Sequence, residues 1–313
     1  MSAEPTEQSA PERGDADAVL MLTGAQRAAA PARRMPLAPA WRALKRAPPT
    51  AWFGLLVIAG YVILAVFAPL LAPYGQTDVV GRQYEPWGAR FLFGTDQLGR
   101  DMLSRLVFGA RNTIGIAALA TSLSFLIGGT LGLLAATLGR WTDQLLARLV
   151  DTLMAIPQLI FALMLLSIVG SSVTNLILII AVLDSTRVFR LTRALAMNVV
   201  VLDFVEAARL QAEKLGWIMT REILPNILPP LVAEFGLRFC FVFLTISALS
   251  FLGLGIQPPT ADWGSMVREN AALITYGDVT PLLPAGAIAL LTVAVNFVVD
   301  WFIDKTSGLR DDR

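Results

Sequence analysis

Four ionisable residues lie at helical spacing within otherwise apolar stretches of this chain, where they could pair, carry protons or contact a solute. Glu234 and Arg238 are four residues apart, acid first, and Asp184 and Arg187 are three apart. On a helix, both spacings bring the two side chains to the same face, so each couple can form an ion pair. Charges at membrane depth must face protein or water rather than lipid. The sequence therefore indicates either structural ion pairs or residues that line a transport pathway, and both interpretations stay open.

The residue types offer little for catalysis. The chain contains no histidine, which removes the commonest general base and the commonest metal ligand. It has no Gly-rich loop ending in Lys-Ser or Lys-Thr, the motif that cradles nucleotide phosphates. Its apolar stretches hold no paired acids and no motif-placed nucleophile, which a membrane-embedded hydrolase would need. The single cysteine, Cys240, cannot close an intramolecular disulfide and is expected to be a small packing residue. We expect no catalytic residue, no metal site and no cofactor bound by this chain itself.

The composition predicts a membrane protein. The 313 residues are 55% hydrophobic and 16% charged, with a mean hydropathy of +0.63, outside the range of ordinary soluble domains. A net charge of +1 gives no indication of nucleic-acid binding. Six apolar segments each provide about the ~20 residues that cross a ~30 Å hydrocarbon layer; they are 52–71, 114–138, 149–169, 173–194, 229–252 and 281–301. The predicted fold is an all-α polytopic membrane protein with six transmembrane helices in a domain at 48–301.

The fourth of these segments carries more charge than the others. Asp184 and three arginines, Arg187, Arg190 and Arg193, interrupt it. A central charge costs roughly 2.5 to 3.5 kcal/mol on an insertion scale, so this span must pack against protein or end early. Arginines at every third residue are typical of voltage-sensing helices, but the preference for positive charge at the cytoplasmic end of a span already accounts for them.

The distribution of Lys and Arg predicts that both termini are cytoplasmic. With that orientation, 18 of the 25 Lys and Arg residues lie in cytoplasmic segments and 6 lie in outer segments, as the positive-inside rule requires of a protein in the cytoplasmic membrane. Residues 1–47 are rich in Ala, Pro and Arg and are predicted to form a disordered tail. Residues 302–313 would form a second tail, and 195–226 a cytoplasmic loop.

Four glycines in the second apolar segment could let another helix approach closely: Gly115, Gly128, Gly129 and Gly132. That helix could belong to the same chain or to a partner subunit. Both interpretations remain open at the level of sequence.

The polar segment 206–226, between two spans, is the best candidate for a protein-docking site. Ala207, Ala208 and Ala212 would let a partner approach closely, and Glu206 and Arg209 offer charged contacts at the rim. A solvated amphipathic linker is the alternative interpretation.

Prolines mark the end of this segment. Pro225 is expected to stop it and return the chain to the membrane, and Pro229 and Pro230 to begin the fifth span.

Four stretches, in a fixed order, extend over roughly residues 50 to 300. They are GTDQLGRD at 94–101 with GAR at 109–111, DTLMAIP at 151–157, Glu-Ala-Ala at 206–208 followed by Pro225 and Asn226, and SFLGLG at 250–255 with WGSM at 263–266. Together they resemble the integral-membrane permease subunits of bacterial ATP-binding-cassette (ABC) importers, specifically the dipeptide, oligopeptide and nickel permease family.

The resemblance implies a role and a set of partners. An importer-type permease core with an extra N-terminal span would form the translocation pathway with a second permease subunit in the membrane lipid. Two cytoplasmic ATPases would bind ATP and Mg²⁺, and a periplasmic or extracellular substrate-binding protein would deliver cargo. Di- and oligopeptides come first as substrates, with nickel complexes, opines or glutathione after them. The loop 195–226 would supply the coupling helix that docks on an ATPase, with the site residues Glu206, Ala207, Ala208, Arg209, Ala212, Pro225 and Asn226.

One position departs from the family pattern. The family usually has glycine six residues after the glutamate, where the chain bends, and here that residue is Ala212. Alanine resists a left-handed turn. We therefore expect the bend to be relaxed, or shifted by about one helical turn toward Gly216.

Two further interpretations stay open. A proton-coupled secondary carrier could use Asp184, Glu234 or Asp300 as a relay, without any ATPase, although such a carrier has no evident use for a docking segment. The outer loop 253–280, with Trp263, could either receive a substrate-binding protein or form an interfacial aromatic belt.

Overall fold

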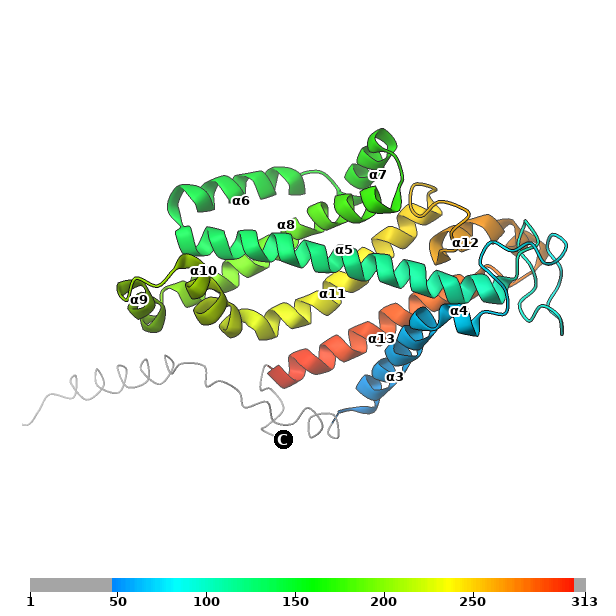
Figure 1. The fold of residues 1–313 in the computed structure, drawn as a ribbon, viewed down its shortest axis with the longest axis horizontal. Coiled ribbons are helices and arrows are strands. Elements are labelled where there is room, and N and C mark those ends of the chain that lie inside the picture. The colour runs from blue at the N-terminus through cyan, green and yellow to red at the C-terminus, as the bar shows by residue number, and fades with distance from the viewer. Residues whose placement is uncertain (1–46, 307–313) are drawn as a thin grey trace, which may run out of the picture. The chain divides into compact units, whose positions relative to one another are not determined.

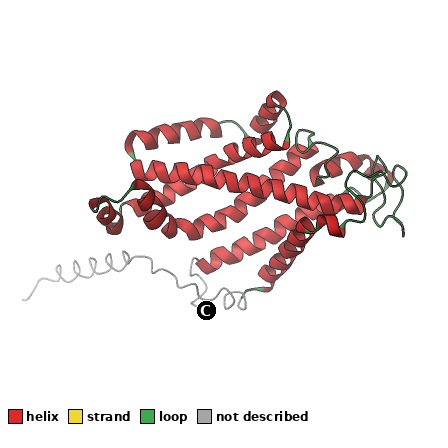
Figure 2. Cartoon of the chain, viewed as in Figure 1, coloured by secondary structure: helices red, strands yellow, loops and turns green. Residues whose placement is uncertain are grey.

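The computed structural model describes residues 47–306, so most of the first predicted tail and residues 307–313 of the second lie outside it. The described part of the chain is helical apart from its loops and two isolated antiparallel bridges, Val79 to Arg100 and Thr95 to Asp101, as Figure 2 shows. The all-α prediction is confirmed.

Five long helices make up most of the described chain: α3 (Pro49–Val66), α5 (Met102–Leu138), α8 (Val173–Val200), α11 (Leu224–Phe251) and α13 (Leu282–Thr306). Figure 1 shows α5, α8, α11 and α13 running lengthwise through the fold, with α3 beside α13. The short helices α9 (Asp203–Leu210) and α10 (Leu215–Trp217) lie at one end. The loop 72–101 and helix α12 (Trp263–Asn270) lie at the other. We call these the α9 end and the α12 end.

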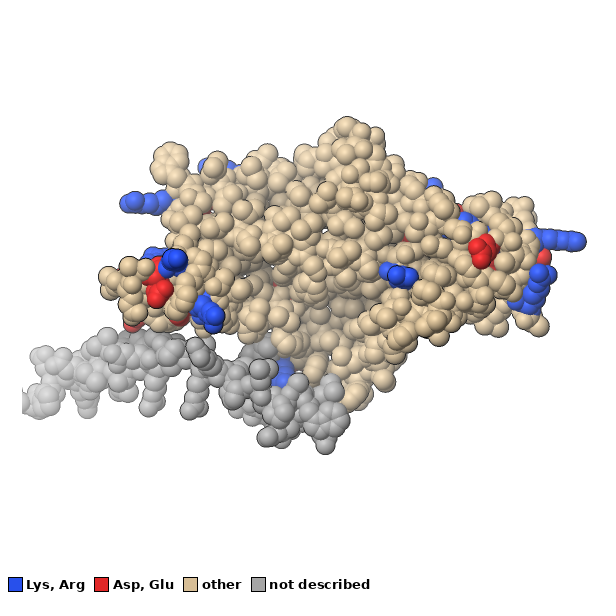
Figure 3. Space-filling view, viewed as in Figure 1, with Lys and Arg blue, Asp and Glu red and all other residues tan. Residues whose placement is uncertain are grey.

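Four helical segments of the described chain are long and apolar enough to cross a membrane by themselves: Pro49–Val66, Met102–Leu138, Leu215–Phe251 and Leu282–Lys305. Each of them overlaps one of the predicted spans, namely the first, second, fifth and sixth. A fifth span results if α6 (Arg140–Met154) and α7 (Gln158–Val169) are counted as one bent pair. Helix α8 begins where the fourth span was predicted, but it carries too many charged residues to cross a membrane on apolar length alone. On the face drawn in Figure 3, charged side chains gather toward the two ends, as expected for a bundle within a bilayer.

The predicted third span is not one straight helix, which corrects the prediction for 149–169. Helix α6 ends at Met154, α7 starts at Gln158, and their axes differ by 85°. Pro157 lacks an N–H and disfavours a helical conformation in the residue before it, so the helix breaks there. Only α7 continues as the apolar part of the predicted span.

The predicted second span is the carboxyl-terminal part of a longer helix. Helix α5 begins at Met102, where the Asp101 side chain caps it by accepting a hydrogen bond from the Ser104 N–H at 2.8 Å. Its 37 residues extend over about 55 Å, more than the ~30 Å hydrocarbon layer. The extra turns reach the α12 end.

The predicted ending at Pro225 is wrong. The helix is continuous from Leu215 to Phe251, and its segment η1 (Ile218–Ile223) is a π-helix. Pro225 lies in the first turn of α11, and Pro229 and Pro230 lie inside this helix. The wide π turns come directly before Pro225, which cannot donate a backbone hydrogen bond into the preceding turn. The helix that carries the fifth span therefore begins at Leu215, well before Pro229 and Pro230.

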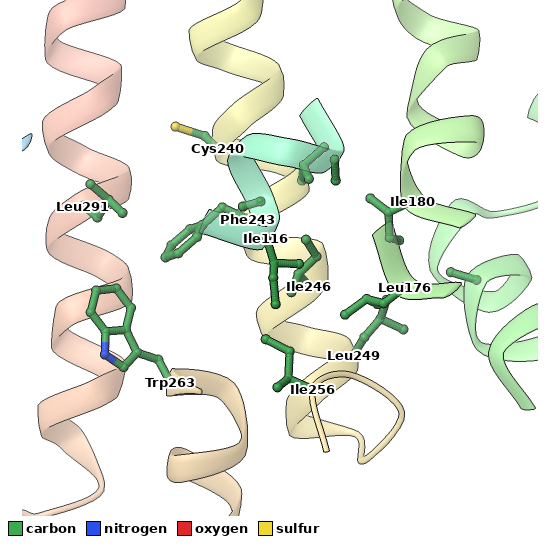
Figure 4. Close-up of a cluster of buried hydrophobic side chains, with 14 of the residues drawn as sticks. Ile116, Leu176, Ile180, Cys240, Phe243, Ile246, Leu249, Ile256, Trp263 and Leu291 are labelled. Atoms are coloured by element: carbon green, nitrogen blue, oxygen red, sulfur yellow. The ribbon is translucent and has the colours of Figure 1, made fainter. Parts of the chain in front are cut away.

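The main hydrophobic core is built around α11. Its residues Cys240, Phe243, Ile246 and Leu249 recur every third residue and are buried. Figure 4 shows them between α13, which contributes Leu291, and α8, which contributes Leu176 and Ile180. Cys240 is buried in this cluster, as predicted for a packing residue.

Two of the four glycines of α5 pack this helix against α8. A Cβ on Gly128 would lie 2.3 Å from the Ser185 carbonyl oxygen, and one on Gly132 would lie 2.9 Å from the Phe189 carbonyl oxygen. Such distances leave no room for a methyl group, so packing within the same chain is confirmed for these two. Gly115 and Gly129 have no neighbour within 4 Å of the added atom.

Candidate functional site

Helix α9 forms a short projecting segment at the α9 end, and it holds the predicted docking residues (Figure 1). Glu206, Ala207 and Arg209 are exposed on it. Leu210, which is not one of the predicted docking residues, is 82% exposed and adds an apolar group to the same segment. An exposed apolar residue bordered by charges is the usual composition of a protein-docking surface.

Ala208 is not part of this exposed surface, which corrects the prediction. It is 6% exposed and packs with Val205, Ile218 and Ile223 in a second hydrophobic cluster. Val205 and Ala208 are three residues apart, so one face of α9 turns inward and anchors the helix. The small size of Ala208 serves packing within the chain.

The bend after α9 is at Ala212, which corrects the expectation that it is relaxed or shifted. Ala212 has φ 57°, a left-handed conformation. The Ala212 N–H donates to the Arg209 carbonyl at 3.0 Å, and the Glu213 N–H donates to the Ala208 carbonyl at 3.2 Å. This pair of hydrogen bonds is the Schellman motif, in which glycine is usual at the left-handed position. The turn therefore keeps the shape that glycine usually allows, and Ala212 adopts a strained backbone conformation in it.

The remaining predicted docking residues lie around this helix. The Arg209 guanidinium donates to the carbonyl of Thr137, near the end of α5, at 3.3 Å. Pro225 and Asn226 are exposed on the first turn of α11, where the Asn226 amide donates to the Glu222 carbonyl at 2.5 Å. Arg209 thus connects α9 to α5, and α9 also packs against η1.

A cluster of charges lies inside the bundle, near the middle of α8 and α11. Arg238 Nε is 2.7 Å from Glu234 Oε1, and Arg238 Nη1 is 3.8 Å from Asp184 Oδ1. Ser124 of α5 donates to the Asp184 carboxylate at 3.3 Å. Asp184 is 1% exposed, whereas Arg238 and Glu234 retain 12% and 21% exposure of their side chains.

The structure confirms the predicted Glu234–Arg238 pair, but an Asp184–Arg187 pair does not form. Asp184 turns toward Arg238, while the Arg187 side chain is exposed. Arg187 lines a cavity of about 110 Å³ beside the break between α6 and α7, together with Met154 and Pro157. Asp184 and Arg187 therefore contact different parts of the structure, although they are only three residues apart on α8.

Helix α6 contacts the two other arginines of α8, Arg190 and Arg193. Arg193 forms a two-point ion pair with Asp143, of which the Nη2 to Oδ2 distance is 2.6 Å. Arg190 lies 3.7 Å from the Met154 sulfur. The amphipathic α6 thus packs along the arginine-bearing side of α8.

A closed ring of four buried charges lies at the α12 end, and it was not among the sites predicted from the sequence. Asp96 Oδ2 lies 2.6 Å from Arg100 Nε and 3.0 Å from Arg105 Nη1. Glu269 Oε2 lies 3.3 Å from Arg100 Nη2 and 3.2 Å from Arg105 Nη2. All four side chains are at most 6% exposed. Burial raises the pKa of Glu269, and the Arg100 guanidinium opposes this shift. The ring joins the loop before α5 to α12.

Trp263 lies in the core, so it belongs to neither an exposed receptor surface nor an interfacial belt. It is 1% exposed, contacts the rings of Tyr61 and Phe243, and donates from Nε1 to the Leu106 carbonyl at 2.9 Å. Gly109 makes room for it, since a Cβ there would lie 2.6 Å from Trp263 Cδ1.

The Asp262 carboxylate caps the start of α12. It accepts a hydrogen bond from the Ser265 N–H at 2.8 Å. Burial raises the pKa of Asp262.

Comparison with known proteins decides the family. The family of binding-protein-dependent transport system inner membrane components matches residues 128–306, which include α9 and the charge cluster. The N-terminal transmembrane domain of oligopeptide transport permease C matches residues 36–86, which include α3. The chain belongs to this permease family.

Similar full-length relatives agree with this assignment. The dipeptide transport system permease protein DppC of Alkalihalophilus pseudofirmus is 35% identical over 260 residues, which cover 82% of this chain and 83% of the relative. The di/tripeptide transport system permease protein DppC of Pseudomonas aeruginosa is 37% identical, with 82% and 85% covered. The DppC protein of Haemophilus influenzae is 32% identical, with 83% and 88% covered. The resemblance to dipeptide and oligopeptide permeases is confirmed, and the permease has the expected extra N-terminal span.

Proposed function

We propose that this permease is a transmembrane subunit of an ATP-driven ABC importer of di- and oligopeptides. It would form the pathway with a second permease subunit, while two ATPases at its cytoplasmic side bind ATP and Mg²⁺. A soluble binding protein would deliver peptides to the opposite side. The names of the relatives, which are dipeptide and di/tripeptide permeases, support the substrate class.

One observation carries the proposed docking of an ATPase. Helix α9 presents Glu206, Ala207 and Leu210 outward, while Ala208 and the Schellman turn hold it against the bundle. A short, firmly anchored helix with an exposed mixed surface suits docking in the groove of another protein. We infer that this surface is the coupling helix.

The proposed orientation has the α9 end in the cytoplasm. The Lys and Arg distribution supports it. The amino end of α3 and the carboxyl end of α13 also point toward the α9 end (Figure 1), which suits the proposal that both helix ends face the cytoplasm. The binding protein would then meet the α12 end.

The contacts of α9 suggest how ATPase movement reaches the spans. Closure of the ATPases would shift α9, and the Arg209–Thr137 hydrogen bond and the packing of Ala208 on Ile223 would transmit this shift to α5 and α11. Packed helices move as rigid bodies, so the pathway would alternate between inward-open and outward-open states.

The test combines co-purification with uptake. We expect Glu206→Lys to reduce both co-purification of the ATPases with the membrane complex and ATP-dependent dipeptide uptake. Asp78→Lys makes the same charge change at an exposed position of the α12 end, and it should leave co-purification unchanged. Normal co-purification and normal uptake with Glu206→Lys would show that α9 is not the docking site.

A proton-coupled carrier is the second candidate, favoured by one observation. Asp184 is buried at membrane depth with an Oδ1 that has no hydrogen-bond partner, a setting in which carboxylates relay protons. Asp300, the third proposed relay residue, is exposed near the end of α13. Uptake that collapses with an uncoupler and tolerates vanadate would establish the carrier and exclude the importer.

A further inference from the structure

We propose that Arg238, Glu234 and Asp184 form a binding site for the two charged ends of a zwitterionic peptide at the middle of the pathway. This inference rests on the proposed function and adds to it the chemical group that the permease recognises. The carboxylate of the peptide would meet Arg238, and its ammonium group would meet Glu234 and Asp184.

The depth of these charges argues for a function. Arg238 and Glu234 lie near the middle of α11, a span of the permease, and Asp184 lies near the middle of α8. Charges at this depth are costly, and they usually occur where they pair or line a path. Stability alone gives no reason to keep them, because replacing a buried ion pair with apolar residues is often neutral or stabilising.

The cluster also has unused hydrogen-bonding capacity. Asp184 Oδ1 and Arg238 Nη1 are buried and have no hydrogen-bond partner. The Arg238–Asp184 contact, at 3.8 Å, is too long for a hydrogen bond. An incompletely satisfied buried group is a sign of a functional site. Here the free donor, Arg238 Nη1, suits a carboxylate, and the free acceptor, Asp184 Oδ1, suits an ammonium group.

The two residues that a peptide would contact first are partly exposed. Glu234 and Arg238 retain exposure, and two aromatic rings of α11, Phe235 and Phe241, are exposed beside them in sequence. The Arg238 guanidinium lies 4.7 Å from the Phe241 ring centroid. A planar guanidinium that rests on an aromatic ring is positioned for two-point contact with a carboxylate.

An apolar groove is lined by neighbours of the cluster in sequence. Its volume is about 440 Å³, and it lies between α5 and α11. Phe125 and Phe235, which line it, directly follow Ser124 and Glu234 and meet edge to face at 5.1 Å between centroids. Its lining would suit the apolar side chains of a peptide whose charged ends are held by the cluster.

Charge balance explains why a zwitterion fits. It brings one positive and one negative group, so it can exchange partners with the Glu234–Arg238 pair without leaving a charge unpaired. A peptide amide lacks the carboxylate, and an N-acetylated peptide lacks the ammonium group. Each would leave one buried charge of the cluster without a partner, which is strongly unfavourable.

The experiment measures ATP-dependent uptake by the complete transporter in proteoliposomes. Three probes are compared at concentrations that saturate the binding protein: alanyl-alanine, alanyl-alanine amide and N-acetyl-alanyl-alanine. We expect the wild type to prefer the free dipeptide. Arg238→Gln should lower dipeptide uptake about tenfold or more and bring the dipeptide-to-amide ratio close to one. Glu234→Gln should do the same for the dipeptide-to-acetyl ratio. A ratio measured on one preparation does not depend on how much of the variant is folded.

A matched control separates binding from structure. Arg193→Gln breaks an ion pair of α8 outside the cluster and should leave both ratios at their wild-type values. The proposal is overturned if the cluster variants change uptake of all three probes by the same factor, or change none of them. If the wild-type transporter takes up no peptide at all, the proposed function fails and the zwitterion site fails with it.

Discussion

The N–H of Glu213 donates a hydrogen bond to the carbonyl of Ala208 at 3.2 Å, and this bond closes the turn that follows α9. Ala212 occupies the left-handed position of that turn, with φ 57°. The left-handed conformation costs a residue with a Cβ roughly 1 to 2 kcal/mol. The turn that shapes the candidate docking helix is therefore held in place against a local conformational preference.

We predict that Ala212→Gly stabilises this turn by about 1 kcal/mol, because glycine adopts a positive φ without steric cost. Hydrogen exchange of the Glu213 amide should then slow about fivefold. Ala212→Val is the matched opposite, since a β-branched residue is a poor fit at positive φ, and it should speed exchange at the same amide. Equal exchange rates in all three proteins would mean that the turn is not strained.

Neighbouring alanines on α9 should respond differently to the same change. Ala208→Asp introduces a charge into a buried cluster next to Val205, so it should detach α9, at a cost of several kcal/mol. Ala207→Asp changes an exposed position and should leave the fold intact while weakening ATPase docking. Limited proteolysis of the loop 195–226 checks the first effect and co-purification checks the second. Proteolysis that is equally fast in both variants would contradict the inward orientation of Ala208.

The adjacent glycines of α5 provide a second matched comparison. A methyl group at residue 128 would lie 2.3 Å from the Ser185 carbonyl oxygen, whereas one at residue 129 meets open space. We predict that Gly128→Ala sharply lowers the yield of folded permease, because overpacking forces α5 and α8 apart. Gly129→Ala should be tolerated by the chain itself. Size-exclusion profiles of the detergent-solubilised protein measure both, and loss of folded protein with the residue-129 variant alone would reverse this assignment.

The ring of charges at the α12 end should be sensitive to the loss of a single member. Arg105→Gln leaves Asp96 and Glu269 with one cation, Arg100, so we expect a destabilisation of about 3 to 5 kcal/mol in this region. Trypsin added from the α12 side should then cut faster in the loop 72–101, which has exposed arginines at 82 and 90. Restoring charge balance with Arg105→Gln/Glu269→Gln should recover part of the resistance. Unchanged cleavage in the single variant would show that the ring does not hold this loop.

Several features follow from residue type and order alone. Apolar length decides which segments can cross a bilayer, so the first, second, fifth and sixth predicted spans each overlap a long apolar helix. The exposed, charged character of α9 is also partly local, because helical spacing places Glu206 on the side away from Val205 and Ala208. The left-handed bend at Ala212 does not follow from residue type, because side-chain preference predicts a strained turn poorly when the packing of the neighbouring helix holds it.

Other features depend on distant partners. Sequence spacing offers Asp184 the neighbour Arg187, but packing of α8 against α11 gives it Arg238 instead, across 54 residues of chain. Asp96 and Glu269 could not be linked from sequence, because no local period connects a loop before α5 to a helix after α11. The side of α8 that α6 covers likewise depends on the direction of the bend at Pro157, which the proline permits without specifying.

The composition and order of residues thus decide that this chain is a helical membrane permease, which segments cross the bilayer, and which short helix stays polar. Hydrophobic length and local periodicity suffice for these, since each acts within one helix. Tertiary packing decides which charges meet in the middle of the bundle and at the α12 end, and that Ala208 faces inward. Those outcomes require several helices to be placed side by side, because a buried charge is stabilised only by the partner that the neighbouring helix brings within reach.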